Sequence, residues 1–126
     1  MPLVKFNDGN DDRAIEWERV FAVLLAPHHA QRPPAEATLY VDLFEDTTTT
    51  VKMVGRELQQ IEAKLAAAGS GFESAGLLYY KKQEVCHIRQ TNQRGGNGSI
   101  LFDMGDNRSL EVQVHHETIE LLLAGL

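Results

Sequence analysis

Histidine and acidic side chains near the carboxyl end are the first candidates for chemistry. The five histidines stand at positions 28, 29, 87, 115 and 116. In a strand over residues 110 to 116, alternate side chains share a face, which would place Glu111, Gln113 and His115 together. A carboxylate beside an imidazole orients the ring and raises its basicity. We therefore take His115, Glu111 and His87 as candidate catalytic residues; the alternative is a solvated sheet face, which antiparallel sheets commonly have.

No motif for a metal site accompanies these histidines. The sequence contains no HExxH, no CxxC and no spaced Cys/His set, so we predict neither a metal nor a cofactor. Cys86 is the only cysteine. Its neighbour His87 would point to the opposite face of a strand, which argues against a nucleophile and base pair. We expect Cys86 to be buried as a small apolar side chain.

Polar and aromatic side chains of the same region are the candidate ligand contacts. An open sheet face, or the groove beside it, would offer Tyr80, His87, Arg89 and Gln113 to a ligand. The glycine-rich segment at 94 to 99 resembles an anion-binding loop. It precedes a strand and lacks the GxxxxGK[ST] and GxGxxG patterns, so we interpret it as a hairpin loop.

The chain ends in a strongly apolar segment. Residues 119 to 126 hold more apolar surface than one face of a short helix hides, and exposed apolar patches mark interfaces. We therefore predict a homodimer contact through Ile119, Leu122 and Leu123, because two-fold dimers are the commonest soluble assembly. The alternative is that this segment packs under the chain's own sheet.

Strand signals separated by turns dominate the second half. We expect strands at residues 77 to 81, 84 to 90, 99 to 104 and 110 to 116, followed by a helix at 118 to 126. Glycine and asparagine clusters stand between the later strands and are typical of hairpin turns. The pattern predicts an antiparallel meander.

The first half combines strand and helix signals. Ala14, Trp17, Phe21 and Leu24 recur at helical spacing, which predicts a helix over 11 to 26. The alternative is a buried strand at 20 to 25, since a short apolar run cannot be assigned by periodicity alone. The remaining predicted elements are a strand at 3 to 6, a turn at 7 to 10, a loop at 27 to 37, a strand at 38 to 44 and a helix ending near residue 68. That helix starts either near 51 or, if 48 to 54 is a strand, near Gly55.

Together these elements predict one α+β domain over residues 1 to 126 with one hydrophobic core. Its antiparallel sheet would have about four to six strands, including the C-terminal meander, and two or three helices would pack on one face. The size is that of a single domain.

The charge balance bounds the partners. The net charge of −6, from 18 acidic and 12 basic residues, opposes binding to nucleic acid or anionic membrane, so we expect neither. With no long apolar run and no paired cysteines, we expect a cytoplasmic protein. The function that follows is a noncatalytic small-ligand-binding or protein-binding regulatory module acting as a homodimer. The alternative is a small enzyme or metal-dependent protein with a His/Glu site on the C-terminal sheet.

Overall fold

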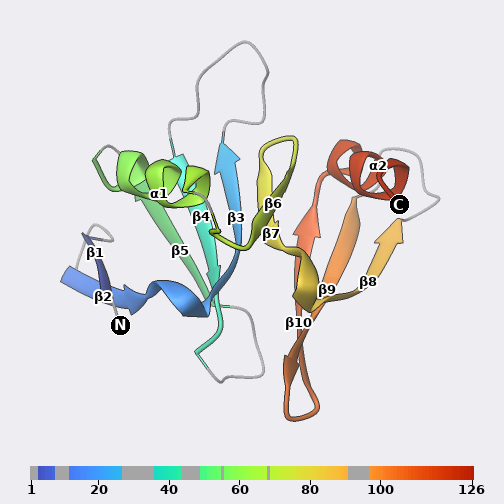
Figure 1. Ribbon diagram of the computed structural model, residues 1–126, viewed down its shortest axis with the longest axis horizontal. Coiled ribbons are helices and arrows are strands. Elements are labelled where there is room, and N and C mark those ends of the chain that lie inside the picture. The colour runs from blue at the N-terminus through green and yellow to red at the C-terminus, as the bar shows by residue number, and fades with distance from the viewer. Residues whose placement is uncertain are drawn as a thin grey trace.

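The chain folds into antiparallel sheets and two α-helices, an α+β arrangement (Figure 1). The computed structural model describes residues 3–7, 12–26, 36–43, 49–54, 56–67, 69–90 and 97–126. The predicted turn at 7 to 10 and most of the predicted loop at 27 to 37 lie outside these residues.

The first half of the chain supplies a two-stranded sheet and most of a five-stranded sheet. The two-stranded sheet pairs β1 (Leu3–Asn7) with β2 (Asp12–Glu16). The five-stranded sheet has the order β5-β4-β3-β7-β6. Its members are β3 (Val20–Ala26), β4 (Glu36–Val41), β5 (Thr49–Val54), β6 (Phe72–Ala75) and β7 (Leu78–Lys81).

The second half forms a three-stranded meander closed by a helix. Its order is β10-β9-β8. The strands are β8 (Val85–Gln90), β9 (Gly98–Gly105) and β10 (Arg108–Val114). The helices are α1 (Arg56–Ala66) and α2 (His116–Ala124), and short 3-10 turns occupy Trp17–Arg19 and Lys82–Glu84.

The predicted helix over 11 to 26 is wrong, and its alternative is confirmed. Residues 20 to 26 form β3, the central strand of the five-stranded sheet. Val23 and Leu25 pack into one apolar cluster, while Phe21 and Ala22 pack into another on the opposite face. A strand covered on both faces is apolar throughout and loses the alternation that identifies strands.

The alternative for residues 48 to 54 is also confirmed. Residues 49 to 54 form β5, which pairs with β4 from Thr49↔Val41 to Val54↔Glu36, and α1 begins at Arg56. The predicted meander is correct for β8, β9 and β10, but β7 belongs to the five-stranded sheet beside β6, which the sequence did not suggest.

Two apolar clusters replace the single predicted core. In the first, Leu58, Ile61 and Leu65 of α1 cover one face of the five-stranded sheet. In the second, the opposite face packs against the inner face of the three-stranded sheet and against α2. The two helices therefore cover different layers, as Figure 1 shows, and the prediction of helices on one face holds only roughly.

Two contacts fix the three-stranded sheet to the five-stranded sheet. The rings of Phe21 and Phe102 stand 4.9 Å apart, centroid to centroid, in tilted geometry, an arrangement favoured by the charge distribution of aromatic rings. Arg108 of β10 forms a two-pronged ion pair with Asp42, just after β4, and both side chains are less than one-fifth exposed. The orientation of the outer sheet face is thereby set by the core.

Candidate functional site

The outward face of the three-stranded sheet carries a row of polar side chains. Register pairs Ser99 of β9 with Arg89 of β8 on one side and with Gln113 of β10 on the other. The three residues thus lie side by side across three strands. Arg89 and Gln113 are exposed, whereas neighbouring Ile100, Val112 and Val114 point inward and are buried. This alternation is what a sheet with one covered face requires.

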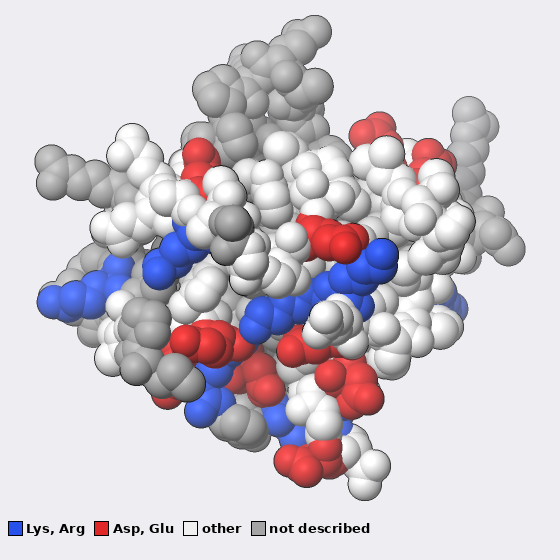
Figure 2. All heavy atoms as spheres, viewed as in Figure 1, with Lys and Arg blue, Asp and Glu red and all other residues white. Residues whose placement is uncertain are grey.

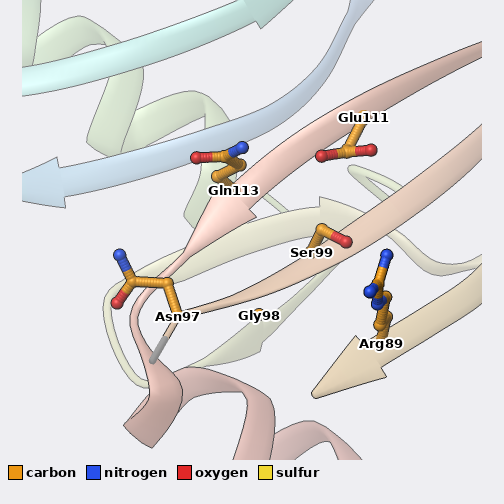
Figure 3. A pocket seen from close by; sticks show the side chains of 6 residues that line it. All are labelled: Arg89, Asn97, Gly98, Ser99, Glu111 and Gln113. Atoms are coloured by element: carbon orange, nitrogen blue, oxygen red, sulfur yellow. The ribbon is translucent and has the colours of Figure 1, made fainter. Parts of the chain in front are cut away.

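A shallow pocket of about 210 Å³ opens over this polar row. The pocket is lined by this row together with Asn97, Gly98 and Glu111. Figure 3 shows that the six lining residues come from all three strands and the segment just before β9. We call Arg89, Ser99 and Gln113 the polar row. All lining residues except Gly98 have side chains that can donate or accept hydrogen bonds.

A second row lies next to the first. Register pairs Leu101 with His87 on one side and with Glu111 on the other. His87 and Arg89 are two residues apart in β8 and therefore share a face. The structure therefore brings His87, Arg89, Glu111 and Gln113 onto one face. The sequence analysis named all four as candidate site residues but did not show that they lie together.

Gly98 allows α2 to pack closely against this end of the three-stranded sheet. A Cβ at position 98 would lie 2.3 Å from Cγ1 of Ile119 and 2.6 Å from the carbonyl oxygen of Arg89. Both distances are far below van der Waals contact, and the second atom belongs to the backbone. Only glycine fits where Ile119 of α2 packs over the first residue of β9.

The histidines at the start of α2 have a structural role. Nδ1 of His115 accepts a hydrogen bond from the backbone N–H of Glu117 at 3.3 Å, which caps the helix as short polar side chains usually do. The rings of His115 and His116 stack with centroids 4.2 Å apart. Ligand atoms of His115, His116 and Glu117 lie within 4.8 Å of one another, and the capping bond uses Nδ1 of His115.

Other predicted site residues lie elsewhere. Tyr80 is 9% exposed and packs in the second apolar cluster; burial, and secondarily the charge of Glu73, raises the pKa of its phenol. Ile119 and Leu122 are buried within the chain, as the alternative for the terminal segment held, while Leu123 is exposed. Side chains buried in this way are not available to a second copy.

The expectation of a buried Cys86 is wrong. Its side chain is exposed, and its thiol lies 3.4 Å from the carbonyl oxygen of Leu101. The cause is a register shift in β8 between Val85 and His87, which turns the thiol out of the alternation that strand geometry predicts.

Charges of both signs are mixed over the surface. Figure 2 shows Lys and Arg interspersed with Asp and Glu on the face it draws. Lys52 pairs with Glu36, and Lys82 pairs with Glu73, at 3.5 and 3.6 Å. In the described part of the chain, neither helix is long and apolar enough to cross a membrane.

Comparison with known proteins gives one structural likeness. No protein-family model matches the chain, and no curated protein matches it. A similar solved structure is the LytTr DNA-binding domain of a methyl-accepting/DNA response regulator from Bacillus cereus. It has a TM-score of 0.49 and 12% identity over 98% of this chain and 97% of that chain. Likeness at this level assigns no activity to this chain.

The partners and function predicted from the sequence are corrected against the description of this neighbour. The neighbour is a DNA-binding domain, against our expectation of no nucleic acid. The homodimeric small-ligand or protein-binding module, and its alternative of a His/Glu enzyme or metal protein, are corrected with it. Net charge sums the entire surface, whereas binding depends on the groups presented at one face, so the charge balance does not exclude a nucleic-acid partner.

Proposed function

We propose that this chain is a DNA-binding module whose contact surface is the outward face of β8, β9 and β10. The observation that carries the proposal is the polar row of Arg89, Ser99 and Gln113 across three strands. Arg pairs with the guanine edge and Gln with the adenine edge through two hydrogen bonds each, while Ser accepts either base. The function of the Bacillus cereus neighbour agrees with this proposal but does not support it further.

Double-stranded DNA fits this surface better than other nucleic acids. On the described part of the outward face there is no Phe, Tyr or Trp, since Phe102 is fully buried. Binding of single strands relies on stacking against such rings. A-form RNA has a deep and narrow major groove that side chains cannot read, whereas the major groove of B-DNA admits a two-stranded β-ribbon such as the β9–β10 hairpin.

The acidic surface makes base contacts the main source of affinity. Phosphate contacts depend on Lys and Arg, and Arg89 is the one cation on the outward face of the described strands. Each neutralised phosphate lowers the slope of log K against log salt by about 0.9. We therefore expect a slope no steeper than about −1, and weak binding to sequences that the row does not recognise. The cytoplasmic location expected from the sequence is part of this proposal.

Fluorescence anisotropy with a pool of random DNA duplexes tests the proposal. We expect measurable binding by the wild type and a loss of about five- to 150-fold with Arg89→Ala, the range of one good bidentate contact. Arg89→Lys keeps the charge but not the fork, so it should not restore binding. Lys82→Ala removes an exposed cation outside the face and should bind as the wild type does. No binding by the wild type, or equal losses in Arg89→Ala and Lys82→Ala, would overturn the proposal.

A further inference from the structure

We infer that alternate residues of β10 read two base pairs that are two steps apart, with an A·T pair at Gln113 and a G·C pair at Glu111. This inference rests on the proposed function and specifies its target. Gln113 and Glu111 are exposed on the same face of one strand, and both line the pocket. Gln pairs with the edge of adenine, and Glu accepts a hydrogen bond from the amino group of cytosine.

The spacing comes from strand and duplex geometry. Residues i and i+2 of an antiparallel strand lie about 6.8 Å apart, twice the rise of about 3.4 Å per residue. Base pairs stack about 3.4 Å apart along each DNA strand. Over the short span of two residues, a strand in the major groove that runs parallel to the helix axis therefore presents alternate side chains to every second base pair.

The hairpin of β9 and β10 is shaped to act as that ribbon. Asp106 and Asn107 both have positive φ, at 53° and 61°, the conformation of the tight two-residue turns that match strand twist. Its inner face is anchored by Leu110 and Val112, which are at most 2% exposed. The ribbon is therefore held rigidly from behind, while Gln113 and Glu111 face outward.

A carboxylate on the contact surface limits where DNA can sit. Glu111 would be repelled by phosphate but favoured at the centre of the groove, where the cytosine amino group offers a donor. Leu101, which pairs with Glu111 in register, would lie beside it and can contact a thymine methyl group. Both features favour a defined sequence over nonspecific attachment.

Selection of binding sequences from a randomised duplex pool, followed by anisotropy on single duplexes, tests the inference. We expect an enriched A·T pair and G·C pair two steps apart, with loss of about five- to 150-fold when either is changed. Changing the separation to one or three steps should cause a similar loss.

Variants assign each base pair to a residue. Gln113→Ala should lose discrimination only at the A·T position. Glu111→Gln should change the preference at the other position from G·C to A·T, because Gln recognises adenine. The matched controls are Gln90→Ala, whose side chain alternates to the other face of β8, and Glu120→Gln, exposed on α2; both should keep the wild-type preference.

The outcomes separate the inference from the function beneath it. Binding that depends on Arg89 but shows no preferred pairs, another separation, or no change of preference in Glu111→Gln would overturn the inference and leave the proposed function standing. Absence of binding to any duplex would overturn both. Tighter binding to single strands or to RNA duplexes than to DNA duplexes would also contradict the inference.

Discussion

The five-stranded and three-stranded sheets of this chain differ in how many faces they bury. The larger sheet is covered by α1 on one side and by the second apolar cluster on the other. The smaller sheet has an apolar inner face and an outward face of polar side chains. A sheet enclosed on both sides can only contribute stability and position, whereas a sheet open on one side can also contact a partner. The enclosed sheet therefore contributes stability and position, whereas the proposed recognition surface lies on the sheet with one open face.

The variant with the largest expected effect on stability changes the inner face of β9. Phe102 is fully buried against Phe21, so Phe102→Ala should lower the free energy of unfolding by about 3–5 kcal/mol through lost burial and a residual cavity. Ser99→Ala, on the outward face of the same strand, should change it by less than about 0.5 kcal/mol. Urea denaturation measures both. Equal effects would show that the two faces do not differ as described.

The ion pair between the sheets should give the next largest effect. Asp42→Asn leaves the guanidinium of Arg108 without its carboxylate partner at a site where both side chains are less than one-fifth exposed. Breaking a fully buried pair costs about 3–5 kcal/mol, and partial exposure lowers our expectation to about 2–3 kcal/mol. Glu36→Gln breaks an exposed pair with Lys52 and should cost at most about 1 kcal/mol. A loss for Asp42→Asn no larger than this control would contradict the account.

A smaller effect is expected where α2 meets the outer sheet. Gly98→Ala introduces a Cβ against Ile119 and the backbone of Arg89 and should destabilise the fold by about 1–3 kcal/mol through overpacking. The double variant with Ile119→Val should recover part of this loss, since valine lacks the Cδ1 atom that lies 2.9 Å from the added Cβ. Thermal denaturation of the three proteins checks the prediction. No recovery would place the strain at the Arg89 carbonyl instead.

The final stability prediction concerns pH at the border between the sheets. Burial raises the pKa of Glu84, Asp42 adds to this rise, and Lys81 opposes it. A carboxyl group whose pKa is higher in the folded state contributes stability at low pH and loses it as pH rises through the folded pKa. The stability of Glu84→Gln relative to wild type should therefore increase from pH 4 to pH 7. Urea unfolding at several pH values checks this, and a constant difference would contradict it.

Predictability from sequence follows the same comparison. The strands at 84 to 90, 99 to 104 and 110 to 116 were predicted within two residues because one face is open and the pattern alternates. β3 was predicted as helix because it is buried on both faces and alternation disappears. β6 (Phe72–Ala75) was missed because it has only four residues, which mix polar and apolar types without a clear strand or helix period.

The candidate site was only partly accessible to sequence reasoning. Arg89, Gln113, His87 and Glu111 were named, but their common face depends on the pairing register of three strands, which neighbouring residues do not encode. Ser99 and Asn97 were missed because they belong to a segment interpreted as a loop. Gly98 could have signalled close backbone approach, since glycine in a strand often does.

Chemical-shift mapping by NMR, with a selected DNA duplex added to labelled protein, tests the central claim most directly. We expect the largest shifts at the amides of Arg89, Ser99 and Gln113 and at the side-chain amides of Gln113 and Asn97, while residues of α1 such as Gln59 remain unchanged. Shifts concentrated on α1 or on the five-stranded sheet, or no shifts at saturating duplex, would contradict the assignment of the outward face as the DNA-binding surface.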